Sequence, residues 1–171
     1  MADNQQRPAF SANGIHLVRT SQQIHVQLSA MADHKASILM GATFVIFTIT
    51  IGQSRDAPPP LPLLILGGAA FFSAVLAVLA ILPATHMRRK KTPLNLLFFG
   101  SFTQLEEEDY INHVVAELAT DESIYRTMAR DIYQNGMVLE RKKYRLLGYA
   151  YRVFLLGLTA SFLAFIVQHL A

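Results

Sequence analysis

The stretch MADHKASILMGATFVIFTITIG, residues 31–52, decides the fold class. After Asp33, His34 and Lys35 it continues for seventeen residues without a charged side chain. A helix that crosses a bilayer needs about 20 mostly apolar residues, and its polar flanks can extend a slightly shorter run. Because a charge at the bilayer centre costs roughly 2.5–3.5 kcal/mol, the three ionisable residues are expected at the membrane surface. Residues 36–52 are therefore predicted to form a first transmembrane helix.

Two further apolar runs, residues 61–83 and 146–171, have the length and composition of transmembrane helices. Over the whole chain 52% of residues are hydrophobic and only 16% are charged, whereas soluble domains carry about 25% charged residues. No strand is indicated. The sequence thus predicts an all-α membrane protein with three transmembrane helices and a cytoplasmic helical bundle. The chain has no cysteine, which excludes disulfides and thiolate chemistry, and we expect no signal peptide at its start.

The orientation in the membrane is predicted from the positions of lysine and arginine. One basic cluster follows the second apolar run and another precedes the third: Arg88, Arg89, Lys90 and Lys91, then Arg141, Lys142, Lys143 and Arg145. The positive-inside rule places both clusters and the N-terminus in the cytoplasm, and the C-terminus on the outer side of the membrane. The clusters can serve topology and attraction to anionic lipid, worth about 1 kcal/mol per residue, or they can bind phosphate. Both interpretations stay open.

The segment before the first span is predicted to be a cytoplasmic helix over residues 15–35, after a flexible N-terminus of residues 1–14. Its apolar residues have helical spacing, and residue 38 continues the stripe beyond Lys35: Leu17, Ile24, Leu28, Met31 and Ile38. No proline or glycine interrupts the segment from residue 15 onward, so one long helix is expected to run from the cytoplasm into the membrane.

The segment of residues 84–145 is predicted to be cytoplasmic and helical. Thr103 and Glu106 have the spacing of a capping box, which predicts a helix start there, and Thr120 or Asp121 begins a second helix. A bundle made by these helices and the preceding one can hold a ligand between its helices.

Residues with catalytic or metal-binding chemistry do not form a recognisable motif. His16, His25 and His34 are nine positions apart, so on a helix neighbours point to opposite faces and cannot share a metal. Asp109 and His113 stand four apart, which suits a pair of ligands or an ordinary surface pair. No zinc-protease, phosphate-loop or nucleophile-elbow pattern is present. We therefore expect no catalytic residue, no metal, no cofactor and no nucleic-acid partner.

Two other features bear on ligands and partners. Arg126 and Arg130 are not needed for topology, so with Asp131 and Tyr133 they are candidates for contacting an anionic ligand, or else for a helix-surface salt bridge. The second apolar run has a face of small residues: Gly67, Gly68, Ala69, Ala70, Ser73, Ala74, Ala77 and Ala80. Such a face lets helices approach closely within one chain or between copies, and we expect a homo-oligomer.

Three segments carry a family resemblance: ADHKASILMG (32–41), LNLLFFGSFTQLEEEDYI (94–111) and RDIYQNGMVLERKKYRLLGYAYRVFLLGL (130–158). Together they resemble the transmembrane effectors of Pycsar, the pyrimidine cyclase system for antiphage resistance, from about residue 25 to the end. The residues that match the family's pattern are Asp33, Lys35, Asp131, Tyr133, Gly136, Tyr144 and Arg145. The resemblance implies no enzyme but an effector paired with a nucleotide cyclase, whose cUMP or cCMP makes it damage the lipid bilayer and cause abortive infection.

The resulting hypothesis is an inner-membrane effector in which Asp33 and Lys35 couple the cytoplasmic part to the membrane. The alternative is a non-enzymatic membrane anchor or adaptor whose cytoplasmic helices bind a protein partner. The two differ in whether expression together with the cyclase is toxic.

Overall fold

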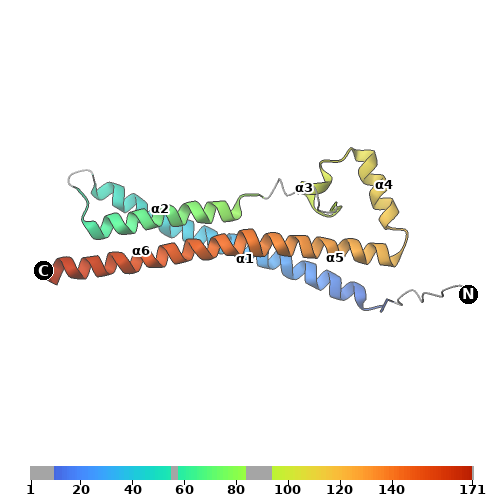
Figure 1. Cartoon of the computed structure of the whole chain (residues 1–171), viewed down its shortest axis with the longest axis horizontal. Coiled ribbons are helices and arrows are strands. Elements are labelled where there is room, and N and C mark those ends of the chain that lie inside the picture. The colour runs from blue at the N-terminus through green and yellow to red at the C-terminus, as the bar shows by residue number, and fades with distance from the viewer. Residues whose placement is uncertain (1–9, 55–57, 84–93, 171) are drawn as a thin grey trace, which may run out of the picture. The chain divides into compact units, whose positions relative to one another are not determined.

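The computed structural model describes residues 10–54, 58–83 and 94–170, and in this part of the chain every regular element is a helix. The elements are α1 (Gly14–Gln53), α2 (Leu61–Ile81), α3 (Phe99–Phe102), α4 (Glu107–Glu117), α5 (Asp121–Val138), the π-helical η1 (Leu139–Tyr144) and α6 (Arg145–Leu170). They belong to two compact units, drawn in Figure 1. The first unit comprises Met1–Val26 and Ala84–Gly136, and the second comprises Gln27–Pro83 and Met137–Ala171.

Three helical stretches are long and apolar enough to cross a membrane: Gly14–Gln53, Leu61–Ile81 and the continuous run Asp121–Leu170. The predicted all-α class and the three candidate spans are thereby confirmed. The assignment of residues 15–35 and 84–145 to the cytoplasm stays a prediction. Most of the predicted flexible N-terminus and all of the cluster Arg88, Arg89, Lys90 and Lys91 lie outside the described residues.

The second unit is built on close contact between small residues of its three helices. α2 lies beside α6 and the C-terminal half of α1 (Figure 1), and the buried core is mostly alanine: Ala32, Ala36, Leu39, Ala77, Ala80, Leu147 and Ala150. Ser73 donates its hydroxyl proton to the Ala150 carbonyl at 2.9 Å, and Ser161 donates to the Pro62 carbonyl at 2.7 Å. The small-residue face of α2 is therefore largely used inside one chain, and it does not by itself support an oligomer.

The contacts within the second unit show that α1 and α6 run in the same direction and α2 runs against them. At one end of the unit, Asp33 of α1 contacts Lys143 of η1. At the other end, Thr50 near the end of α1 lies against Gly67 in the first half of α2. Leu82, just after α2, is bonded to Lys142 at the first end. A chain that enters the membrane along α1 and re-enters along α6 from the same side needs this arrangement. It agrees with the topology that the basic residues predict.

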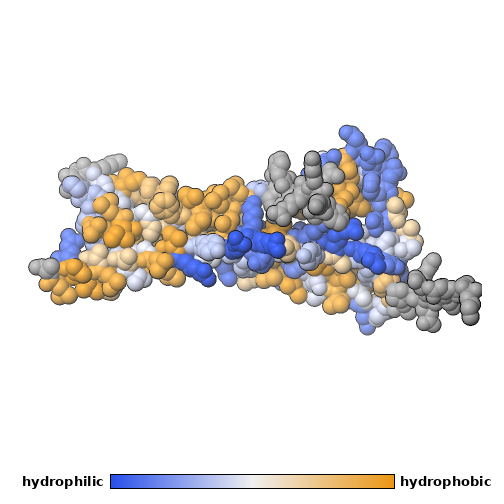
Figure 2. Space-filling model, viewed as in Figure 1, coloured by the Kyte–Doolittle hydropathy of each residue, from blue (hydrophilic) through white to orange (hydrophobic). Residues whose placement is uncertain are grey.

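The outer surface of the second unit is apolar. Figure 2 shows the hydrophobic side chains gathered there, and the exposed ones include Phe44, Phe71, Phe72, Leu155, Leu156, Phe162 and Leu163. An exposed apolar surface of this extent is unfavourable in water and suits lipid.

The first unit is made by the N-terminal part of α1, α3, α4 and most of α5. The expected start of α5 is confirmed, because the Ser123 backbone N–H donates to the Thr120 side-chain oxygen at 3.2 Å. The expected capping box is wrong. Glu106 is the N-cap of α4 but makes no side-chain capping bond, and the Thr103 hydroxyl donates backward to the Phe99 carbonyl at 2.6 Å, at the end of α3. The Thr103 hydroxyl thus donates to the Phe99 carbonyl of α3 and does not cap α4, as its spacing from Glu106 had predicted.

Candidate functional site: a charged junction of three helices

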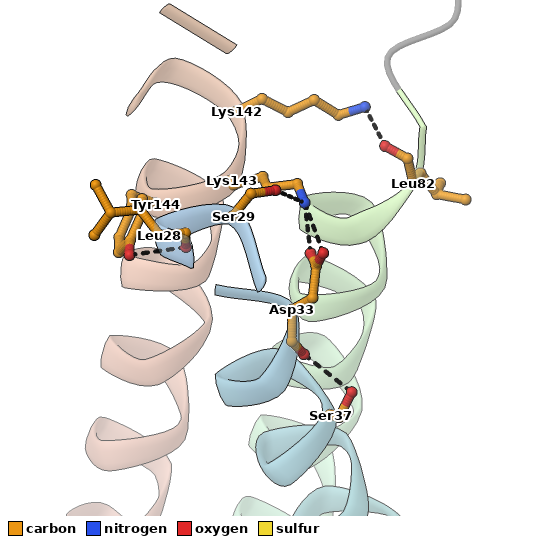
Figure 3. A network of polar contacts seen from close by, with 8 residues as sticks. All are labelled: Leu28, Ser29, Asp33, Ser37, Leu82, Lys142, Lys143 and Tyr144. Atoms are coloured by element: carbon orange, nitrogen blue, oxygen red, sulfur yellow. Dashed lines mark hydrogen bonds and ion pairs between the residues drawn. The ribbon is translucent and has the colours of Figure 1, made fainter. Parts of the chain in front are cut away.

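A charged pair joins α1 to the helix that leads into α6. The Lys143 ammonium donates to both Asp33 carboxylate oxygens, at 2.7 and 2.8 Å, and to the Ser29 hydroxyl at 2.7 Å (Figure 3). These three contacts use all three protons of the ammonium group. The Lys143 side chain is only 20% exposed, while that of Asp33 is 47% exposed. The pair is therefore less screened by solvent than an ordinary surface pair.

The neighbouring lysine reaches the third helix. Lys142 donates its ammonium proton to the Leu82 carbonyl, just after the end of α2, at 2.6 Å (Figure 3). A cation at this place also interacts favourably with the helix dipole of α2. Both lysines belong to η1, a six-residue π-helical segment. π-helical turns inside α-helices frequently mark functional sites. Two consecutive side chains thus attach η1 to α1 and to α2.

Two tyrosines complete the junction along α1. The Tyr144 hydroxyl donates to the Leu28 carbonyl and the Tyr151 hydroxyl to the Lys35 carbonyl, each at 3.1 Å. The Lys35 side chain itself is exposed and makes no hydrogen bond or ion pair within the described part of the chain. The side chains of Asp33 and Lys35, predicted together as coupling residues, therefore differ: that of Asp33 contacts η1, and that of Lys35 contacts no other described helix through a hydrogen bond or ion pair.

The central contact of the junction is ionic and partly exposed to solvent. Separation of Asp33 from Lys143 leaves two charges that water or lipid headgroups can solvate, at a modest cost compared with a fully buried pair. The neighbouring contacts, such as those of Ala32 and Ala36, are apolar. The arrangement is thus suited to a reversible contact between α1 and η1.

A second polar centre lies in the first unit, around Asp131. Its carboxylate accepts from Asn95 at 3.0 Å, from Asn135 at 2.8 Å and from Gln22 at 3.4 Å, all through side-chain amides. Asp131 is 7% exposed and Asn95 only 2%. One turn earlier on α5, the Thr127 hydroxyl is also buried, and it has no partner among the described residues. Asp131 thus connects α1, the segment before α3, and α5.

The structure does not bring the four predicted ligand residues to one point. Arg126 pairs with Glu122 at 2.7 Å on the exposed surface of α5. Arg130 and Tyr133 follow on the same helical stripe, and Arg130 makes no hydrogen bond or ion pair with any described residue. Asp131 points instead toward the interior amides. The stripe of Arg126, Arg130 and Tyr133 is therefore one surface, and Asp131 belongs to another.

The remaining predicted residues have simpler surroundings. His113 contacts the backbone carbonyl of Asp109 at 2.6 Å, so this pair does not present two metal ligands. Among the described residues, no group of three histidine or acidic side chains could hold a metal ion. Arg141 is exposed, 3.8 Å from Glu140, and Arg145 is exposed as well. Within the described part of this basic cluster, Lys142 and Lys143 alone make contacts to other helices.

Sequence patterns missed the partners of the two aspartates. Lys143 was counted with the basic residues that set topology, and Asn95 and Gln22 carried no signal of burial. The one available signal was that Asp33 and Lys35 lie two positions apart on a helix, cannot pair with each other and so require other partners.

Comparison with known proteins identifies relatives over nearly the whole chain. The family model described as "Pycsar effector protein domain" (PycTM) matches residues 16–168. The protein named "Pycsar effector protein PtPycTM" from Propioniciclava tarda is 27% identical over 148 residues, which cover 78% of this chain and 73% of that protein. No solved structure gives a significant match.

Proposed function

The chain belongs to the Pycsar effector protein family, and from this premise we propose that cUMP or cCMP activates it to impair the cell inner membrane. The family implies a role in antiphage defence, together with pairing to a cyclase and a cyclic nucleotide signal. It is a family of effectors and not a known catalytic family. The proposal adds the identity of the messenger, the damage to the bilayer and the resulting abortive infection.

The observation that carries the proposal is the Asp33–Lys143 contact. It is a polar, partly hydrated connection in a unit whose other contacts are mostly apolar and small. A messenger can shift an equilibrium only by binding one state better than the other, and a hundredfold preference supplies about 2.7 kcal/mol. That amount is comparable to the cost of separating a partly buried ion pair. A nucleotide with that preference would change the ratio of the two states of this junction by up to about a hundredfold.

The first unit is the proposed place of nucleotide binding. Arg130 has no protein partner among the described residues and lies on the stripe shared with Arg126 and Tyr133, so a phosphate and a pyrimidine ring could contact this surface. Asp131 we assign to holding the unit together. The buried, unpartnered Thr127 hydroxyl and His25 Nδ1 are further groups that a bound base could satisfy.

The test of function is dye influx into cells that express the full chain together with the cyclase. We expect Asp33→Asn and Lys143→Gln chains to insert and bind nucleotide normally but to lose influx. The double variant Asp33→Lys with Lys143→Asp restores the opposite charges and should recover part of it. If both single variants admit dye as the native chain does, the junction is not the coupling point.

The orientation is tested separately. A reporter fused after Ala171 should read periplasmic, and one inserted near Thr120 should read cytoplasmic, because both basic clusters flank the segment that contains Thr120. The reverse readings would place the first unit outside the cell, where a cytoplasmic messenger cannot reach it.

The adaptor function remains a second candidate because of α4. Ile111 and Val115 of α4 and its C-cap residue Leu118 are exposed, at 41%, 62% and 62%, and have the spacing of one helical face. A partner protein could cover that face. An adaptor predicts no dye influx on expression with the cyclase, which separates it from the effector.

A further inference from the structure

α1 carries an exposed apolar stripe with a strict spacing of seven residues. The stripe consists of Leu17, Ile24, Met31, Ile38 and Val45, which are 71%, 48%, 51%, 57% and 55% exposed. The opposite side of the helix packs within the chain, through Ala32, Ala36 and Leu39 in the second unit. An isolated helix drifts about 20° per seven residues, so a sustained repeat of seven is the pattern of helices that supercoil around one another.

A second exposed line accompanies the stripe three positions further on. It consists of small or polar residues: Thr20, Gln27, His34, Gly41 and Thr48. A Cβ atom added at Gly41 would meet nothing within 4 Å, so this point of the helix is open to a close neighbour. Small and polar residues of this kind are typical of contacts between helices in membranes.

The charge pattern indicates which helix could cover this face. In a parallel pair of identical helices each residue lies near its own copy, so any charge on the contact face would meet a like charge. Neither line contains Asp, Glu, Lys or Arg, and the line that borders the polar one (residues 23, 30, 37, 44 and 51) contains none either. The line on the other side of the apolar stripe (residues 21, 28, 35, 42 and 49) contains one charge, Lys35, at the edge of the contact face. The charges of α1, Arg19, Asp33 and Lys35, all lie outside the first three of these lines. The face is thus complementary to a second copy of itself.

Lipid alone does not account for the stripe. Leu17 and Ile24 precede Asp33 by two to four helical turns, whereas Ile38 and Val45 follow it. If Asp33 lies at the membrane surface, lipid can cover only the second group and water would surround the first. A protein helix can cover both groups.

We propose that α1 associates in parallel with α1 of further copies through this face. The proposal rests on the proposed function, because it names the partner with which the effector assembles, but it does not depend on which nucleotide activates it. In a ring of three or more copies, the apolar stripe contacts the neighbouring helices. The line of Thr20, Gln27, His34, Gly41 and Thr48 belongs to the same contact face and lets the neighbouring helix approach closely.

The chain has no cysteine, so single cysteines report this contact without a background. Ile38→Cys is compared with Leu163→Cys on α6, since both native side chains are 57% exposed. After oxidation of membranes from cells that express the cyclase, we expect disulfide-linked dimers at least fivefold more abundant for Ile38→Cys. Met31→Cys and Val45→Cys should behave like Ile38→Cys, and Phe47→Cys, exposed on α1 but off the stripe, should behave like Leu163→Cys. Equal cross-linking at Ile38 and Phe47, or at Ile38 and Leu163, would overturn the interface.

Dye influx in the same strains separates the interface from the function. Cross-links that follow the spacing of seven, in cells without influx, support the interface and contradict the proposed effector activity. Dye influx in cells whose cross-links do not follow the spacing of seven supports the effector activity and contradicts the interface. A Gly41→Leu chain gives an independent check: we expect at least fivefold fewer Ile38→Cys dimers, because the bulky side chain prevents close approach. Undiminished dimers would contradict the proposed packing.

Discussion

Asp33 and Asp131 carry the same carboxylate in contrasting surroundings. Asp33 is half exposed and accepts from an ammonium group, whereas Asp131 is buried and accepts from three neutral amides. When the Asp33 pair opens, water can solvate both charges. When the Asp131 cluster opens, a carboxylate and buried amides lose their partners inside the unit, where each unpaired group costs about 1–3 kcal/mol. The first contact is thus suited to switching and the second to holding a shape.

The largest effect is expected for Asp131→Ala. The substitution leaves the amides of Asn95, Asn135 and Gln22 without their acceptor, and we expect it to lower the free energy of unfolding by about 2–4 kcal/mol. Thermal unfolding of the detergent-solubilised full chain and its susceptibility to protease measure this loss. Asp131→Asn keeps the size and one acceptor oxygen and should lose less. Native-like unfolding of Asp131→Ala would remove the contrast between the two aspartates.

An intermediate effect is expected when Asp33 and Lys143 are neutralised singly and together. In a double-mutant cycle on the free energy of unfolding, the coupling between the two residues should be about 1–2 kcal/mol. This value lies between those of exposed and buried ion pairs. The exposed pair Arg126–Glu122 is the matched control, and its coupling should be about 0.3–0.5 kcal/mol. If the two cycles give the same coupling, the junction is an ordinary surface ion pair.

The smallest effect is expected for Lys35→Ala. Because the Lys35 side chain has no partner among the described residues, we expect unchanged unfolding and dye influx within about twofold of the native chain. This prediction separates Lys35 from Asp33, with which the sequence had grouped it. Lost influx from a well-expressed Lys35→Ala chain would return Lys35 to the junction.

Local patterns predicted the elements of this chain well. Hydropathy located the three spans, and the uninterrupted run through Lys35 predicted the continuous helix α1. The Thr120 cap was found because its partner, Ser123, is only three residues away. Such local features are often accessible from the sequence, but the equally local capping box of Thr103 and Glu106 was predicted wrongly, because the Thr103 hydroxyl donates to the Phe99 carbonyl instead.

Contacts between distant segments could not be predicted in the same way. Lys143 is one of four basic residues within five positions, and no spacing rule selects it as the partner of Asp33, 110 residues away. Asn95 stands in an apolar stretch of sequence that carries no signal of a polar partner, and its bond to Asp131 places it inside the first unit. The small face of α2 could likewise serve one chain or several copies, because small residues favour close approach in either case.

The π-helical segment η1 makes the register between α5 and α6 sensitive to the number of residues in it. A π-turn inserts one residue more per turn than an α-helix does, so η1 acts as a one-residue insertion between α5 and α6. Deleting one residue there would let an ordinary α-helix form, yet it would rotate every later side chain by about 100° relative to those before it. Lys142 and Lys143 could then no longer reach Leu82 and Asp33 while Ser73 and Ser161 kept their contacts along α6. The rotation of α6 about its own axis, relative to α5, thus depends on a single residue of η1. Adding or removing one residue at this point rotates the last span without altering the sequence of the span.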